Sequence, residues 1–270
     1  MQDLWKVILL GIIEGITEFL PVSSTGHLIV AAALLDFQAA GSTFEIFIQL
    51  GAVVAVIAYF SRQLFEQVRR VPSDQGVQRL WLGIVVAFIP AAVIGFLFND
   101  WIDSVLFNPT VVAISLIVGG VIFLIIERRP VSDEGRTTEL TAISLRQALF
   151  VGLAQTLALI PGVSRSGASI IGGMLAGLNR QVATEFSFYL AIPTLGVATI
   201  YSLVKDLDVL SQNDLVYLII GAVISGIVAW MSIAWLLRYI ARNNFVAFGY
   251  YRIIAGALIL VLVLLGVFGS

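Results

Sequence analysis

Two short polar stretches interrupt an otherwise apolar sequence, and they hold most of the side chains that could do chemistry. The first is PVSSTG at residues 21–26, and the second is PGVSRSG at residues 161–167. Hydroxyl groups, main-chain N–H groups near glycines and an arginine are donors that bind phosphate oxygens. We therefore expect an anion-binding site, most simply one for phosphate, where the two stretches come together.

Two carboxylates precede the first stretch. Glu14 and Glu18 are four residues apart, so both lie on one face of a helix. In an apolar helix such a pair persists only if the groups are protonated, paired or bound to a cation. Hard divalent ions such as Mg²⁺ and Ca²⁺ prefer oxygen ligands. The spacing favours a divalent-cation site; the alternative is a pair of surface acids near a helix end.

The first stretch opens a short helix with Ser23, Ser24, Thr25, Gly26 and His27. The start of a helix offers free backbone N–H groups and a positive dipole end, which together bind anions. His27 is the single histidine of the chain, and a histidine can move protons near neutral pH or attack phosphorus. The neighbouring hydroxyls and carboxylates favour a catalytic role for His27 over a purely structural one.

The second stretch supplies Arg165. Its forked guanidinium fits phosphate oxygens and can stabilise the charge that develops during phosphoryl transfer. The alternative is an ion pair with Glu14 or Glu18, and one arginine can serve both purposes. Other members of the two stretches are expected to contact the phosphates: Ser23, Thr25, Gly26, Ser164, Ser166 and Gly167. Three polar residues beside apolar segments either support the site or simply lie at helix ends: Glu45, Gln49 and Glu185.

The composition is that of an all-α integral membrane protein. Of the 270 residues, 59% are hydrophobic and 12% are charged, and the mean hydropathy is +1.01. A soluble domain has about 25% charged residues. The net charge of −2 gives no basic surface for nucleic acid. The chain has no cysteine, which excludes disulfides, thiolate metal sites and cysteine nucleophiles.

The apolar runs predict six membrane spans and two broken hairpins. The spans are expected at about 42–60, 80–98, 110–127, 183–204, 215–237 and 251–268. Residues 3–35 and 146–178 are each interrupted by one of the polar stretches. The pieces after the breaks, 27–35 and 168–178, are too short to cross about 30 Å of hydrocarbon at about 1.5 Å per residue. Each region is therefore interpreted as a re-entrant hairpin, against the alternative of kinked ordinary spans.

Arginine distribution predicts the orientation in the membrane. Segments 61–79, 128–146 and 238–252 carry three or four arginines each, the last including Arg252. Segment 99–109 has no lysine or arginine, and 205–214 has only Lys205. Basic loops face the cytoplasm. This places 99–109, 205–214 and both termini outside, with the first hairpin entering from the outer side and the second from the cytoplasmic side.

The two halves of this single membrane domain resemble each other. GIIEGITEFLPVSSTG at residues 11–26 aligns with GLAQTLALIPGVSRSG at residues 152–167. Each half, about 1–128 and about 146–270, contains one hairpin and three spans. Because three is odd, the second copy must be inverted in the membrane. Inverted repeats with paired broken helices place a site at their interface near the bilayer midplane.

The motifs resemble those of the undecaprenyl-diphosphate phosphatase family, which is also known for bacitracin resistance. The resemblance is carried by EGITEFLPVSSTGH at 14–27, PGVSRSG at 161–167 and FEIFIQLGAVVAV at 44–56. It implies hydrolysis of the terminal phosphate of a polyprenyl diphosphate at the bacterial cytoplasmic (inner) membrane, with the site open to the outer, periplasmic side. It also implies dependence on Mg²⁺ or Ca²⁺ and often a homodimer.

In this interpretation Glu14 and Glu18 hold the cation, Arg165 clamps the diphosphate, and either Ser24 or His27 attacks phosphorus. A flippase or transporter for a polyprenyl phosphate is the main alternative, because inverted repeats and broken helices are typical of transporters. A carboxylate pair beside a single histidine favours the enzyme. A structural membrane scaffold is disfavoured by ionisable residues in apolar segments.

Overall fold

The computed structural model describes residues 3–37, 41–128, 134–206 and 212–268, and over these ranges it contains helices and no β-strand. The α-helices are α1 (Leu4–Thr17), α2 (Ser24–Leu34), α3 (Gly41–Tyr59), α4 (Ser61–Arg70), α5 (Gln75–Leu106), α6 (Pro109–Glu127), α7 (Leu145–Gln155), α8 (Arg165–Leu175), α9 (Arg180–Asp206), α10 (Gln212–Ile240) and α11 (Val246–Leu264). Two 3₁₀ turns cover Leu140–Ala142 and Thr156–Leu159.

The expected multi-pass membrane protein is confirmed. In the described part of the chain, α5, α6, α9, α10 and α11 are long and apolar enough to cross a membrane. The sixth expected span, 42–60, corresponds to α3, which bends by 66° into α4. The expectation of a loop at 61–79 was wrong, because α4 occupies much of it. The helices also extend beyond the expected spans, since α5 continues to Leu106 and α11 begins at Val246.

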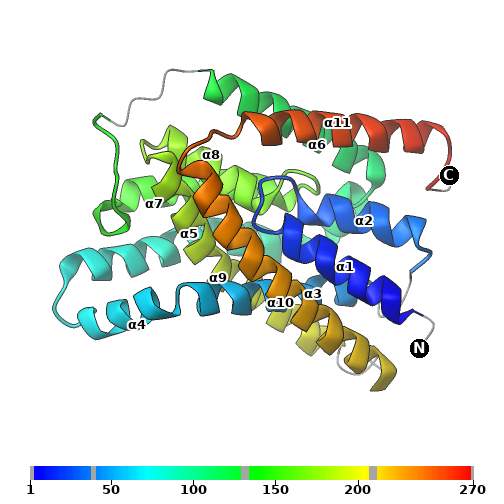
Figure 1. The fold of residues 1–270 in the computed structure, drawn as a ribbon, viewed down its shortest axis with the longest axis horizontal. Helices are drawn as coiled ribbons and strands as arrows, with labels where there is room; N and C mark the ends of the chain where they lie inside the picture. Colours follow the sequence, from blue (N-terminus) through cyan, green and yellow to red (C-terminus); the bar gives the residue numbers. More distant parts are fainter. Residues whose placement is uncertain (1–2, 38–40, 129–133, 207–211, 269–270) are drawn as a thin grey trace.

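Both broken hairpins are present. α1 packs on α2 and α7 packs on α8, with the polar stretches between them (Figure 1). The second helix of each pair has 11 residues. At about 1.5 Å per residue such a helix reaches only about half-way through a bilayer. The short second helices therefore agree with the expected hairpins, while their re-entrant path and the membrane side from which each one enters remain predictions.

Equivalent glycines place the two hairpins against the long helices. A Cβ atom added to Gly11 of α1 would lie 2.9 Å from the carbonyl oxygen of Gly221 in α10. One added to Gly152 of α7, the aligned residue, would lie 2.3 Å from the carbonyl oxygen of Ala87 in α5. Each hairpin therefore approaches a long helix of the other half closely at the same point. These matches agree with two related halves, whose boundaries and inverted orientation remain predictions.

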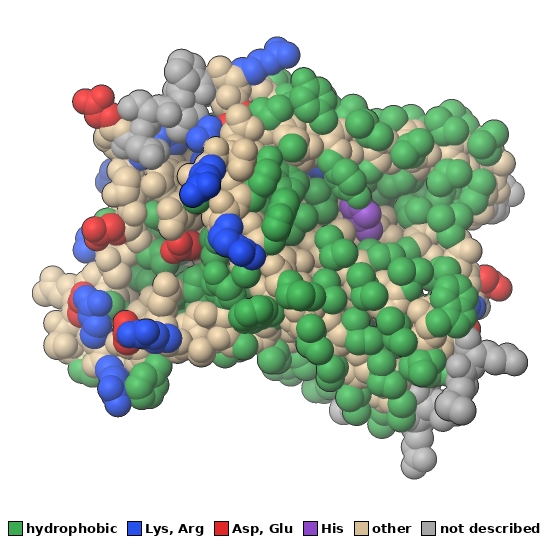
Figure 2. Space-filling model, in the orientation of Figure 1, with side chains coloured by type: hydrophobic (Ala, Val, Ile, Leu, Met, Phe, Trp, Pro, Cys, Tyr) green, Lys and Arg blue, Asp and Glu red, His purple; other side chains and the backbone are tan. Residues whose placement is uncertain are grey.

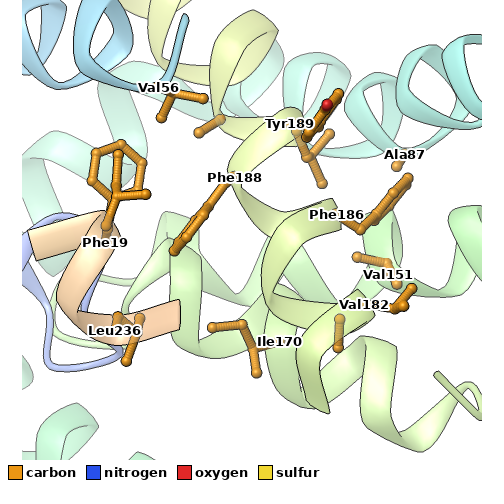
Figure 3. Packing of buried hydrophobic residues seen from close by; sticks show 14 of the residues in the cluster. Phe19, Val56, Ala87, Val151, Ile170, Val182, Phe186, Phe188, Tyr189 and Leu236 are labelled. Atoms are coloured by element: carbon orange, nitrogen blue, oxygen red, sulfur yellow. The ribbon is translucent and has the colours of Figure 1, made fainter. Parts of the chain in front are cut away.

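An aromatic core packs beside the first break. Phe19, just after α1, makes an edge-on contact with Phe188 of α9, with ring centroids 5.1 Å apart (Figure 3). Phe186 and Tyr189 of the same helix are fully buried beside it. Burying each such side chain removes a large apolar area from lipid or water and adds dispersion contacts. α9 is thus held in the centre, where it contacts α3, α5 and α8.

An apolar band lies beside a basic end on the face shown in Figure 2. Hydrophobic side chains cover most of the face shown in Figure 2, whereas most of its lysines and arginines gather at the left end. Both chain termini lie at the opposite end (Figure 1). This arrangement agrees with the grouping of basic segments on one side of the membrane and the termini on the other.

Candidate active site

The two breaks meet around one cavity of about 290 Å³. Most of its polar lining comes from the two hairpins, and it includes half of the residues singled out from the sequence. The members from the breaks are Glu18, Ser23, Ser24, Thr25, Pro161, Gly162, Ser164 and Arg165. The expectation that the two stretches come together is confirmed.

The rest of the lining is mainly apolar. It comes from α3, α5 and α9 and from the turn before α8, with Ile46, Ala91, Gly95, Ile102, Phe107, Leu159, Leu195 and Ala198. One cavity therefore joins a cluster of hydroxyl and charged groups to an apolar passage. Such a lining suits a molecule with an anionic head and a hydrocarbon tail.

Each break contains a serine with an unusual backbone conformation. Ser23 has φ 72° and Ser164 has φ 74°. A non-glycine residue in this region costs of order 1–3 kcal/mol and persists only when its surroundings hold it. Both are N-caps whose hydroxyl oxygen accepts from the backbone N–H three residues on, at Gly26 (3.4 Å) and Gly167 (3.1 Å). The caps start α2 and α8 at the cavity wall, where the first helical N–H groups have no intrahelical acceptor.

Glu18 joins the two breaks. One of its oxygens accepts a hydrogen bond from Arg165 Nη2 at 3.0 Å, and the other accepts from Ser24 Oγ at 2.5 Å. The side chains of Arg165 and Glu18 are only 10% and 4% exposed, so the pair is shielded from solvent. Arg165 Nη1 also donates to the Ser187 carbonyl at 2.9 Å. The ion pair left open as an alternative for Arg165 is present, and Arg165 still lines the cavity.

Glu14 is fully buried one turn before Glu18, and neither of its carboxylate oxygens has a hydrogen-bond partner. No group of three or more histidine, aspartate or glutamate side chains able to hold a metal occurs in the described ranges. Mg²⁺ commonly uses only one or two protein carboxylates, with water and substrate phosphates completing its shell. An orphaned carboxylate beside Glu18 fits that donor set, and the divalent cation remains a prediction.

His27 lies in the first turn of α2 but does not line the cavity. Its Nδ1 is 2.7 Å from the Ser23 carbonyl, and its Nε2 is 2.6 Å from the Tyr251 hydroxyl. A carbonyl can only accept, so Nδ1 carries a proton, and in the neutral ring Nε2 then accepts from Tyr251. The ring also stacks on Tyr251, with centroids 5.6 Å apart. His27 therefore holds the strained Ser23, and Tyr251 of α11 holds the His27 ring.

Arg252 was missed by sequence reasoning, which placed it in a basic cytoplasmic loop. It lies inside α11 and is fully buried. Its Nη1 donates to the Pro21 carbonyl at 3.1 Å, and its Nη2 donates to the carbonyls of Gly162 (3.0 Å) and Val163 (2.9 Å). One guanidinium thus binds both breaks. The sequence did contain an indication of this role. Arg252 stands within an apolar run with no proline or glycine next to it, and an ionisable residue in such a run usually faces the protein interior.

The remaining predicted residues do not all line the cavity. Gln49 lines the cavity, whereas Glu45 and Glu185 do not. Ser166 is fully buried and links the breaks, because its hydroxyl donates to the Leu20 carbonyl at 3.0 Å. Three polar residues that were not predicted also line the cavity: Asn99, Gln155 and Thr194.

Comparison with known proteins gives consistent matches over nearly the whole chain. The model of the family described as bacitracin resistance protein BacA matches residues 7–258. The undecaprenyl-diphosphatase of Deinococcus radiodurans is 50% identical, over 95% of this chain and 94% of its own length. That of Albidiferax ferrireducens is 49% identical over 94% and 93%. Undecaprenyl-diphosphatase 1 of Chromobacterium violaceum is 49% identical over 95% of both.

Proposed function

Because this chain belongs to the family of bacitracin resistance protein BacA, we propose for it the reaction named for its relatives, the hydrolysis of undecaprenyl diphosphate. The products are undecaprenyl phosphate and inorganic phosphate, so the enzyme recycles the lipid carrier of cell-wall synthesis and confers bacitracin resistance. The observation that carries the proposal is one cavity in which an arginine, hydroxyls and two helix starts adjoin an apolar passage.

The diphosphate binds at the polar end of this cavity. The Arg165 guanidinium supplies charge and directional donors for the phosphate oxygens. The N-terminal ends of α2 and α8 add backbone N–H groups and their positive dipole ends. The polyprenyl chain then follows the apolar lining between α3, α5 and α9 into the bilayer.

Ser24 is the nucleophile in this proposal, because its hydroxyl lines the cavity and already donates to a carboxylate. As Ser24 Oγ bonds to the terminal phosphorus, its proton passes to Glu18. The bond to the bridging oxygen breaks, and Glu18 gives the proton to that oxygen as undecaprenyl phosphate leaves. Water then attacks the phosphoserine, and Glu18 moves one water proton to Ser24 Oγ as inorganic phosphate forms. His27 keeps Ser23, and so the start of α2, in place.

Glu14 and Glu18 would hold the divalent cation through carboxylate oxygens. When bound, the cation would offset the negative charge of the diphosphate and of the transition state. The unpartnered carboxylate of Glu14 supports this assignment.

The site opens to the outer side of the cytoplasmic membrane in this proposal. The cavity is lined by Asn99, Ile102 and Phe107, which belong to or adjoin the segment 99–109 that carries no lysine or arginine. A segment without basic residues is expected outside. The same face would receive diphosphate released by cell-wall synthesis.

Phosphate release by purified protein in detergent, with undecaprenyl diphosphate as substrate, tests the proposal. Detergent removes the two compartments that a transporter needs, so only an enzyme turns over. Ser24→Ala should lower the rate by more than about a hundredfold, and Ser104→Ala, at an exposed site outside the cavity, should not. A wild-type protein that releases no phosphate but moves lipid phosphate across vesicles would establish the transporter instead. An acid-labile phosphoenzyme would identify His27 rather than Ser24 as the nucleophile.

A further inference from the structure

Gln155 is a buried cavity residue whose side-chain oxygen has nothing to bind. It is the last residue of α7, is 1% exposed, and lines the cavity together with Ser164 and Arg165. Its Oε1 has no hydrogen-bond partner, whereas its Nε2 is 3.4 Å from Thr194 Oγ1. A buried amide oxygen without a donor destabilises the folded chain, so its position calls for a ligand.

The orientation of the amide follows from Thr194. The Thr194 hydroxyl donates its one proton to the Leu190 carbonyl at 2.7 Å. It can therefore offer only lone pairs to Gln155, and the amide must turn its NH₂ group toward it. This leaves Oε1 as a fixed acceptor, so the missing ligand must be a hydrogen-bond donor or a cation.

Water is the reactant that meets this requirement. Ionised phosphate oxygens only accept hydrogen bonds, so the diphosphate cannot satisfy Oε1. The cation is expected at the carboxylates of Glu14 and Glu18, whose negative charge attracts it more strongly than a neutral amide oxygen does. Gln155 is aligned with Glu14 in the repeat, and its neutral amide adds no charge that would repel the substrate. Glutamine is a residue that orients attacking water in other phosphoryl-transfer enzymes.

We propose that Gln155 Oε1 holds the water molecule that hydrolyses the phosphorylated Ser24; this rests on the function proposed above. The water oxygen forms a bond to phosphorus while the bond from phosphorus to Ser24 Oγ breaks. One water proton stays on the released phosphate, and the other passes through Glu18 to Ser24 Oγ. Gln155 accepts a hydrogen bond from the water throughout and takes no proton.

Rapid-quench kinetics with a substrate labelled at the terminal phosphorus tests this step. Gln155→Met removes the acceptor and keeps a chain of similar length. We expect this variant to form the monophosphate product in a burst of about one per protein, with the label retained on the protein. Loss of the label should then be roughly a hundredfold slower than in wild type, as for a misplaced reactant. Gln155→Glu retains an acceptor oxygen and should lose the label faster than Gln155→Met.

Three outcomes overturn the assignment, and thermal denaturation in detergent checks that each variant folds. The first is a Gln155→Met enzyme that clears the label at the wild-type rate. The second is a folded variant that has lost the burst as well, which would give Gln155 a role in binding. The third is normal clearance restored by high Mg²⁺, which would make Oε1 a cation ligand. Failure of the proposed function differs from all three, since Ser24→Ala would then turn over without any label on the protein.

Discussion

The Ser24 hydroxyl donates to a carboxylate that is itself paired with Arg165. Replacing Arg165 therefore has two effects: the phosphates lose a ligand, and Glu18 loses its partner. Arg165→Ala should lower kcat/KM by roughly a hundred- to a thousandfold in steady-state assays with a short-chain diphosphate. Arg165→Lys should rescue it poorly, because one ammonium cannot replace a fork that binds both Glu18 and the Ser187 carbonyl. A lysine variant with wild-type kinetics would contradict this account.

Replacing Glu14 should remove the dependence of activity on a divalent cation. Its buried carboxylate has no partner in the described structure, so a divalent cation is its expected ligand. Glu14→Gln should abolish activation by Mg²⁺ or Ca²⁺ and slow turnover by more than about tenfold, or 1.36 kcal/mol of barrier. Titration of activity with each ion measures this, with the exposed Glu66→Gln as the matched control. Unchanged metal dependence in Glu14→Gln would remove it from the ligand set.

Among the helices, close packing at glycine decides which substitutions are tolerated. A Cβ on Gly51 of α3 would lie 1.9 Å from the Ala222 carbonyl oxygen in α10, whereas one on Gly196 of α9 would meet nothing within 4 Å. Gly51→Ala should destabilise the protein by about 1–3 kcal/mol through overpacking. Gly196→Ala should be neutral or slightly stabilising, since alanine favours the helix. Thermal denaturation of both variants in one detergent compares them directly, and equal midpoints would argue against the α3–α10 crossing.

Arg252 links three elements, because α11 carries it and both breaks accept its hydrogen bonds. Arg252→Met should leave the carbonyls of Pro21, Gly162 and Val163 without this donor. We expect a loss of several kcal/mol, at about 1.5–3 kcal/mol for each hydrogen bond to a charged group. Both the denaturation midpoint and the activity should fall. Arg242→Met, at an exposed position, should change neither. If Arg252→Met kept full stability, the guanidinium would not be what joins the breaks.

The sequence predicted the elements better than their ends. Long apolar runs identify spans whatever their neighbours, but helix ends depend on contacts made in three dimensions. The helix α4 was not predicted, because its charged residues made the amphipathic segment look like part of a basic loop. Arg252 was misplaced because counting arginines assumes that each one faces water, whereas this one binds buried carbonyls.

The pairing of Glu18 with Arg165 could be anticipated, since both stand at breaks that had to meet. The roles of Gln155 and Tyr251 could not be anticipated, because the sequence does not show which way a single polar side chain in an apolar helix faces. Only the alignment of Gln155 with Glu14 in the repeat hinted at a role.

At the scale of the whole molecule, the basic end and the end with both termini predict which side faces the cytoplasm. Because the chain has no cysteine, single cysteines can report the side unambiguously. A cysteine at the exposed Ser73 should react with a membrane-impermeant reagent only after the cells are opened. A cysteine at the exposed Ser104 should react in intact cells. Labelling of position 73 from outside would reverse the orientation and move the proposed site to the cytoplasmic side. The homodimer implied by the resemblance stays a separate prediction.

The hydrogen bonds of Arg252 to both breaks also affect whether this protein could move its lipid product across the bilayer. A carrier that alternated between the two leaflets would have to part the breaks, and each such movement would leave a buried guanidinium without some of its acceptors. Breaks that stay together take lipid from one leaflet and return the shortened lipid to that same leaflet. We therefore expect that this protein does not itself carry the product across the bilayer, and that dephosphorylation and translocation are separate events for each lipid molecule.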